Sequence, residues 1–474
     1  SGYPFAIMNR LAVINVVGLT ADLIDRGMPR IKAIAQQGGI THIDPALPAL
    51  TCTAQSNYLT GSKPSTHGIV ANGWYDRDLA EVQFWKQPNQ LVQAPKVWEQ
   101  LREQIPDFTC AKLFWWYNMH STADFSITPR PMYPADGRKF FDIYSWPYNI
   151  RPEITRDLGA FPFPAFWGPA AGVHSPQGEP DAVSRWIANA AKWMESHHKP
   201  SLNLIYLPHL DYNLQRHGPG HSSIPDDLKR IDHIVGDLFD FLLGQGVDAL
   251  ILSEYGITEV EKAIHLNRLF REQGWLTIKE ELGHELIDFG ASKVFAVADH
   301  QVAHVYIQDA TMIRQVRTVI ESVEGVDWIW SGEDKAKQCI DHGRSGDLVV
   351  FSKDWAWFTY YYWLDDQKAP DFARCVDIHR KPGYDPVELF LDPALKFPKL
   401  KIVQRLLQKK LGFRMLMDVI PLDATLVKGS HGTRPADERH FPVILSNTSG
   451  LIPDDDCISS VRVAEVIKSY FSDQ

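Results

Sequence analysis

Short apolar runs alternate with stretches of helical spacing along this chain, and this alternation limits most strongly what the chain can fold into. Residues 11–17 form a nearly continuous apolar run that ends at Gly18, and residues 21–37 have the spacing of an amphipathic helix. The same order returns later, with predicted helices over 181–196 and 224–244 and predicted strands over 202–207 and 247–253. Apolar strands that are separated by helices indicate a parallel sheet covered on both faces.

Two stretches interrupt this pattern and divide the chain into a core and two insertions. Residues 114–179 are rich in Trp, Tyr, Phe and Pro, which favours an irregular aromatic lid over one end of the sheet. Packing within a loop-rich segment is the simpler interpretation of the same aromatics. Residues 262–426 predict a small α+β subdomain. The remaining residues, 9–113, 180–261 and 427–474, form the core, a doubly wound, mostly parallel α/β sheet.

Composition excludes several classes of protein. The chain has 474 residues, 45% of them hydrophobic and 22% charged, which is the balance of a soluble globular enzyme. Its net charge of -10 argues against sequence-independent nucleic-acid binding, which requires a basic face. No apolar run is long enough to span a bilayer. The five cysteines are scattered and form no C-x-x-C pair, which favours a reducing, cytoplasmic location.

A turn that carries hydroxyl groups precedes a short predicted helix near residue 51. Thr51 or Thr53 would stand at the start of that helix, among free N–H donors and at the positive end of the helix dipole. Such a position suits an anion or a hydroxyl with a lowered pKa. Taken alone, the threonine is more simply explained as a helix cap.

Polar side chains also follow the carboxyl ends of two predicted strands. Asp211 comes after the strand over 202–207, and Glu254 and Tyr255 come after the strand that ends at residue 253. His431 lies late in the chain, in a Gly-Ser-His-Gly sequence. Open α/β sheets bind ligands outside the carboxyl ends of their strands. We therefore expect these side chains to meet Thr51 in one pocket.

The sequence resembles the type I phosphodiesterase / nucleotide pyrophosphatase branch of the alkaline phosphatase superfamily. The resemblance covers residues 11–255 and the chain from 428 onward, and its most specific part is the threonine segment followed by His67-Gly-Ile-Val-Ala-Asn72. It implies that Thr51 is the nucleophile and that Asn72 contacts phosphoryl oxygens. It also places the family's metal-binding motifs on Val17-Gly18, on 211–219, on Ser253-Glu254-Tyr255-Gly256 and on Gly429-Ser-His431-Gly432.

Several of the family's metal-binding positions are altered in this chain. The resemblance implies two zinc ions close together, bridged by the phosphoryl group. Here the early Asp is Val17, the first His is Gln215, and the Asp-His pair is Glu254-Tyr255. Val17 cannot bind a metal ion, and an amide is a poor ligand for zinc. We therefore expect one divalent ion rather than two.

The remaining polar groups leave three arrangements open. Without a metal ion, Glu254 could act as a general base on Thr51 or on a substrate hydroxyl, with Tyr255 as an acid. The pocket could also bind a ligand and carry out no chemistry. With a single zinc, manganese, magnesium or calcium ion, the candidate ligands are Asp211, Gln215, His217, Glu254 and His431.

Other cations and histidines outside the core strands are candidates for supporting roles. Arg138, Arg380 and Lys381 could bind an anionic substrate, although such stretches are equally typical of solvated loops. The pair Asp299-His300, together with His304, could supply further ligands, but histidines in a hairpin are more often structural.

We predict a hydrolase of a phosphodiester, a phosphomonoester or a phosphonate, acting on a small phosphorylated molecule. Its candidate catalytic residues are Thr51, Asn72, Glu254 and Tyr255. The alternatives are an inactive binding or scaffold protein of the same fold, or a transferase or lyase that uses Glu254 and Tyr255.

Overall fold

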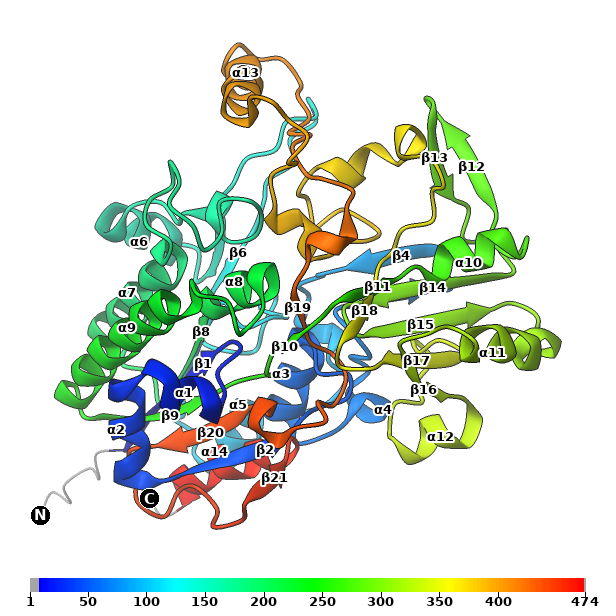
Figure 1. The fold of residues 1–474 in the computed structure, drawn as a ribbon. Helices are drawn as coiled ribbons and strands as arrows, with labels where there is room; N and C mark the ends of the chain where they lie inside the picture. Colours follow the sequence, from blue (N-terminus) through cyan, green and yellow to red (C-terminus); the bar gives the residue numbers. More distant parts are fainter. Residues whose placement is uncertain (1–7, 473–474) are drawn as a thin grey trace, which may run out of the picture.

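A nine-stranded sheet forms the centre of the computed structural model, which describes residues 8–472 (Figure 1). Its strands lie in the order β21-β2-β20-β9-β1-β8-β5-β6-β7. Their bounds are Arg10–Val16 (β1), Ile40–Asp44 (β2), Cys110–Leu113 (β5), Phe125–Pro129 (β6), Ile143–Trp146 (β7), Leu202–Leu207 (β8), Val247–Leu252 (β9), Val443–Ser446 (β20) and Cys457–Ser459 (β21).

The centre of this sheet is the most apolar part of the chain. β1 lies between β9 and β8 and runs parallel to both. Its residues from Leu11 to Val16 are all buried, because helices cover both of its faces. The strands predicted over 11–17, 202–207 and 247–253 are therefore confirmed.

Helices cover the sheet in two groups, as expected for a doubly wound core (Figure 1). One group packs together beside β8, β9 and β20, and the other packs together around the helix that begins at Thr51. The first group is α1 (Ala21–Gly27), α2 (Pro29–Gly38), α7 (Ala182–His197) and α9 (Ile224–Gly244). The second is α3 (Thr51–Thr60), α4 (Pro64–His67), α5 (Val97–Gln104) and α14 (Arg462–Ser472).

Two details of the core differ from the sequence predictions. The single helix predicted over 21–37 is divided between α1 and α2, because Pro29 lacks a backbone N–H and starts a new helix. The sheet is mostly parallel, but β20 pairs antiparallel with both β2 and β9. The C-terminal part of the chain therefore supplies an interior strand of the sheet.

The range predicted as an aromatic lid also contributes to the main sheet. β6 pairs parallel with β5, and β7 pairs antiparallel with β6 at the edge. The helix α6 (Ile150–Leu158) follows them. Both strands are short and lie among prolines, so their period-two pattern is weak in the sequence.

The second predicted insertion contains its own antiparallel sheet of four strands, in the order β14-β15-β17-β16. The helices α10 and α11 pack against it, as expected for an α+β unit. These elements are α10 (Leu266–Glu272), β14 (Val294–Asp299), β15 (Val302–Ile307), α11 (Ile313–Glu321), β16 (Val326–Trp330) and β17 (Leu348–Ser352). The other strands are β3 (Gly73–Asp76), β4 (Glu81–Phe84), β10 (Thr258–Glu259), β11 (Lys262–Ile264), β12 (Ile278–Glu281), β13 (His284–Ile287), β18 (Ala356–Phe358) and β19 (Gly429–Ser430). The other helices are α8 (His209–His217), α12 (Gly332–Lys337) and α13 (Pro398–Lys410).

Two further observations concern membrane-spanning helices and the cysteines. Among the helices of residues 8–472, none is both long enough and apolar enough to cross a bilayer. All five cysteines lie in this range, and each is a free thiol.

Candidate active site

Thr51 is the first residue of α3, at the point where the chain turns after β2. Leu50 precedes the helix in an extended conformation and provides no side-chain cap. Among the N–H groups of the first turn, that of Cys52 donates to the Asn72 side chain. Thr51 is buried, with 5% of its surface exposed, and its Oγ1 lies 3.5 Å from Tyr255 Oη. The hydroxyl thus stands at the positive end of a helix and at the limit of hydrogen bonding to a phenol.

Tyr255 connects Thr51 to Asp211. Tyr255 Oη donates to Asp211 Oδ1 at 2.9 Å, and Gln215 Nε2 donates to the same oxygen at 2.8 Å. Asp211 and Gln215 are four residues apart on α8, so they share one face of that helix. Burial raises the pKa of Asp211 to about 6, against the opposing effect of these two hydrogen bonds.

His431 lies flat against the Tyr255 ring. The two rings are parallel within 2°, with their centroids 3.5 Å apart. His431 Nδ1 donates to the Ala49 carbonyl oxygen at 2.7 Å, which leaves Nε2 as the unprotonated ring nitrogen. Burial lowers the pKa of His431 to about 3, so the ring is neutral. The His300 ring is also close to His431, tilted by 32° and with 4.1 Å between the ring centroids.

Glu254 is fully buried beside this group. Neither of its carboxylate oxygens forms a hydrogen bond of standard geometry with another described residue. Burial raises its pKa to about 8, while the side chains of Gln55, Asn15 and Thr51 lie close enough to oppose that rise. Because this pKa lies above neutrality, Glu254 is mostly protonated at pH 7 and can donate a hydrogen bond.

Asn72 is joined to the helix that carries Thr51. Its Oδ1 accepts from the backbone N–H of Cys52 at 2.9 Å. Its Nδ2 donates to Asp299 Oδ1 at 3.2 Å and to Tyr384 Oη at 3.0 Å. Tyr384 in turn donates to Asp299 at 2.6 Å, and burial raises the pKa of Asp299 to about 7. Both protons of the Asn72 amide are therefore engaged within the protein.

Three of these neighbours come from the second insertion and are not among the predicted catalytic residues. Asp299 and His300 were considered only as supplementary ligands, and Tyr384 lies in a donor-rich stretch near Arg380. No local pattern shows that this stretch folds back onto the core. The insertion thus completes one wall of the candidate site.

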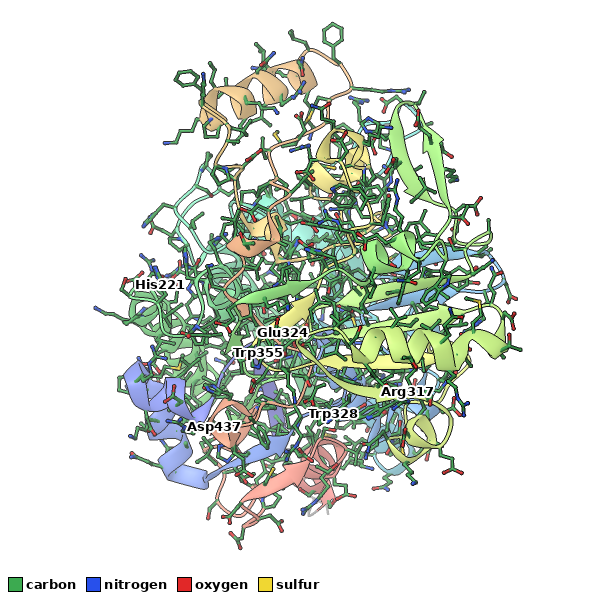
Figure 2. The ribbon with its side chains drawn as sticks, turned by 45° about the vertical axis from the view of Figure 1, so that its right-hand side comes forward. His221, Arg317, Glu324, Trp328, Trp355 and Asp437 are labelled. Carbon is green, nitrogen blue, oxygen red and sulfur yellow. The ribbon has the colours of Figure 1, made fainter. Side chains whose placement is uncertain are left out.

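Several predicted residues lie in other contacts. His217 stacks on His221 at 4.4 Å between ring centroids, and His221 is at the outer side of the molecule (Figure 2). Arg138 is exposed and pairs with Asp136. The remaining two cations are turned elsewhere: the Arg380 guanidinium lies over the Tyr133 ring, and the buried Lys381 forms an ion pair with Glu388 at 3.3 Å. The structure therefore brings together Thr51, Asp211, Gln215, Tyr255 and His431, with Glu254 and Asn72 alongside.

The residues present do not fit the two-ion arrangement implied by the resemblance. Val17 offers no ligand. The Gln215 amide nitrogen donates to Asp211, and its Oε1, which has no hydrogen-bond partner among the described residues, is a poor ligand for zinc. The Tyr255 ring covers one face of His431. Within residues 8–472, no group of three or more His, Cys, Asp or Glu side chains is placed to hold a metal ion.

Comparison with known proteins identifies a family whose profile matches most of this chain, and two relatives of low sequence identity. The family profile described as type I phosphodiesterase / nucleotide pyrophosphatase matches residues 11–385. An uncharacterised pyrophosphatase/phosphodiesterase of Schizosaccharomyces pombe is 20% identical over 266 residues, which cover 54% of this chain and 47% of that protein. Rat ectonucleotide pyrophosphatase/phosphodiesterase family member 1 is 24% identical over 253 residues, covering 51% of this chain and 23% of the relative. The matches span less than half of both relatives.

Solved structures match almost the whole chain at low identity. Murine ectonucleotide pyrophosphatase / phosphodiesterase 5 has a TM-score of 0.56 at 12% identity, covering 98% of this chain and 95% of its own. An inactive threonine-to-alanine variant of that protein, in complex with AMP, has a TM-score of 0.57 at the same identity and coverage. Phosphonoacetate hydrolase from Sinorhizobium meliloti 1021, in complex with phosphonoformate, has a TM-score of 0.60 at 13% identity and covers 98% and 96%. The fold is thus of the alkaline phosphatase type.

Proposed function

Because this chain belongs to the type I phosphodiesterase / nucleotide pyrophosphatase family, we propose that it hydrolyses a phosphodiester, a phosphomonoester or a phosphonate with Thr51 as the nucleophile. The observation that carries this proposal is the series Thr51 Oγ1, Tyr255 Oη and Asp211 Oδ1 at the start of α3. The solved relative described as inactive after a threonine-to-alanine exchange supports a catalytic threonine in this fold.

In the proposed reaction, Thr51 Oγ1 forms a bond to phosphorus while the bond from phosphorus to the leaving group breaks. The hydroxyl proton passes to Tyr255 Oη as the phenol proton passes to Asp211, so no free phenolate has to form. Asp211 can accept this proton because its pKa of about 6 leaves it mostly ionised at pH 7. The leaving group takes a proton from water. Water then forms a bond to phosphorus as the bond from phosphorus to Thr51 Oγ1 breaks, and Thr51 recovers its proton from Asp211 through Tyr255.

Two features of the site favour an anion despite its buried acids. The N–H groups and dipole of the first turn of α3 stabilise negative charge near Thr51. Glu254, which is mostly protonated at pH 7, can donate a hydrogen bond to a phosphoryl oxygen instead of repelling it. In this role Glu254 is a donor, whereas at higher pH it would become a base.

A binding protein without catalytic activity is the second candidate, and one observation favours it. Both Asn72 amide protons are donated to Asp299 and Tyr384, so they are not directed toward a phosphoryl group. A pocket that keeps the fold and the helix N-terminus but loses this contact could bind a phosphorylated ligand and leave it intact.

The finer details of the proposal concern metal, substrate contacts and location. We propose at most one divalent ion, and the relay described above requires none. Arg138 and Arg380 remain candidates for contacts with the substrate; Lys381 is the weakest candidate, because its charge is already paired with Glu388. Five free cysteines support a cytoplasmic location.

A hydrolysis assay with matched threonine variants tests the proposal. Bis-para-nitrophenyl phosphate, para-nitrophenyl phosphate and phosphonoacetate are offered, each with EDTA and with a panel of divalent ions. Thr51→Val should lower kcat by at least about 1000-fold, because the nucleophile is lost. Thr53→Val is the matched control, since it makes the same change two residues along α3 where the hydroxyl only donates to the Ile69 carbonyl. It should stay within about tenfold of the wild type.

Two results would contradict the proposal. Activity that survives Thr51→Val removes this threonine as the nucleophile. A wild-type protein that binds AMP or phosphonoacetate in calorimetry and hydrolyses none of the substrates is the binding protein of the second candidate.

A further inference from the structure

α13 stands away from the rest of the molecule, and none of its residues is buried (Figure 1). Figure 2 shows its side chains spreading into open space. Large apolar side chains dominate this segment, and seven of them are 50–70% exposed: Phe397, Leu400, Val403, Leu406, Leu407, Leu411 and Phe413.

The orientation of α13 is opposite to that of an ordinary surface helix. Lys401 and Arg405 lie one turn apart and face the protein, where both form ion pairs with Asp418 at 3.1 and 3.0 Å. The leucine-rich stripe at residues 400, 403, 407 and 411 lies on the side that is exposed. A helix that packs on a globular core normally shows the reverse arrangement. The apolar stripe of α13 therefore points away from the rest of the described chain.

The charge of this segment is also opposite to that of the whole chain. The chain has a net charge of -10, yet residues 396–414 contain no Asp or Glu. They contain seven cations: Lys396, Lys399, Lys401, Arg405, Lys409, Lys410 and Arg414. Lys399 and Lys410 are exposed and flank the apolar stripe. A basic helix with an exposed apolar face is typical of segments that lie on membrane surfaces.

The exposed apolar surface continues onto the tip of the first insertion. Lys409 Nζ lies 5.8 and 5.6 Å from the ring centroids of Phe140 and Phe141, and these rings are 36% and 41% exposed. Arg414 Nε donates to the Asp136 carbonyl oxygen at 2.9 Å, which holds the two segments together. The helix and this loop thus form one surface, which we call the α13 face: residues 396–414 with Phe140 and Phe141.

We propose that the α13 face docks on an anionic lipid bilayer. The apolar stripe would enter the boundary between headgroups and acyl chains, and Lys399 and Lys410 would contact the anionic headgroups. A second copy of this chain fits less well, because a symmetric contact would oppose two segments that each carry seven cations. The proposal concerns a helix that lies on the membrane, and it requires no spanning segment.

Co-sedimentation of the full chain with lipid vesicles tests this proposal. The protein should sediment with vesicles of phosphatidylcholine and phosphatidylglycerol, and much less with phosphatidylcholine alone. Val403→Glu/Leu407→Glu should abolish sedimentation, because it puts two charges in the apolar stripe. Lys399→Glu/Lys410→Glu should weaken binding to the anionic vesicles at least about tenfold.

Leu79→Glu/Leu282→Glu is the matched control, since both leucines are exposed and lie on other elements. It should bind anionic vesicles like the wild type, and circular dichroism should show that all variants fold. Equal binding of the wild type to both kinds of vesicle, or binding to neither, would overturn the proposal. A dimer in analytical ultracentrifugation that Val403→Glu/Leu407→Glu converts to a monomer would assign the face to a second copy instead.

Discussion

The structure buries two groups of acidic side chains, and they differ in their partners. In the second insertion, burial raises the pKa of Asp385 to about 6 and that of Glu388 to about 7, and the charge of the buried Lys381 beside them opposes this rise. In the candidate site, Asp211 and Glu254 are equally buried, but the charge of Asp211 adds to the rise in the pKa of Glu254 and no cation opposes it. Among residues 8–472, no Lys or Arg contributes to the pKa shift of either acid.

This difference separates a structural group from a functional one. A buried acid with its own cation is partly compensated, and a fold can keep such a group for architecture alone. The pKa values of both groups are raised, so the distinction depends on the cation: acids that are buried without one are costly, and such uncompensated acids are typical of functional sites. We infer that the first group holds the insertion in shape, and that the second is retained for binding or catalysis.

Removing the cation that lies beside Asp385 and Glu388 should have the largest effect on stability. Lys381→Met leaves Asp385 and Glu388 buried without a cation, and the free energy of unfolding should fall by about 3–5 kcal/mol. Urea unfolding followed by circular dichroism measures this loss. Arg380→Met, a change of the neighbouring but exposed cation, should cost less than about 1 kcal/mol. Equal losses of unfolding free energy in the two variants would show that the buried ion pair stabilises the protein no more than an exposed cation does.

Supplying a metal cation to the acids of the candidate site, Asp211 and Glu254, should have the next largest effect on the free energy of unfolding. Val17→Asp/Gln215→His/Tyr255→His restores the residues that the family resemblance implies, and the variant should retain zinc after dialysis. Free zinc at 100 times its Kd should then raise the free energy of unfolding by about 2.7 kcal/mol. Elemental analysis and thermal unfolding measure both quantities. A variant that binds no zinc would mean that these positions do not converge as the family's do.

Neutralising Glu254 should have the smallest effect on the free energy of unfolding, and the size of this effect should depend on pH. The folded pKa of Glu254 is about 8 and lies above its ordinary value, so the folded state holds more protons than the unfolded state between about pH 5 and 8. Stability therefore falls as pH rises through this range. Glu254→Gln should flatten the decline and add about 2 kcal/mol at pH 8, measured by urea unfolding across pH.

A Glu-to-Gln substitution in the group beside Lys381 is the control for this measurement. Glu388→Gln removes the partner of Lys381, so it should destabilise the protein by about 1–3 kcal/mol. If Glu254→Gln also destabilises at pH 8, the distinction between the two groups is wrong.

The sequence was most informative where local patterns are strong. The strand over 202–207 and the helix over 224–244 were predicted with the bounds that the structure has, because a continuous apolar run and a long amphipathic period each have few other solutions. The meeting of Thr51, Asp211, Tyr255 and His431 followed from the rule that strand ends converge. Their chemical roles stay predictions.

The parts that sequence reasoning missed depend on contacts between distant segments. Tyr384 and Asp299 reach Asn72 because the second insertion folds back onto the core, and no periodicity reports that contact. The partner of Lys381 lies seven residues away across a short turn, at no regular spacing. For Gln215 and His217 a signal existed, since a helix over 209–217 places only the residue four positions after Asp211 on the same face.

The position of β20 has a consequence for how the protein is made. β20 separates β2 from β9 in the sheet, yet it is formed from residues 443–446. Until those residues have left the ribosome, β2 has no strand that joins it to the rest of the sheet, and α3, which begins at Thr51, is the next element after β2. A nascent chain is therefore synthesised past residue 446 before β2, and the threonine that follows it, can be joined to the rest of the sheet.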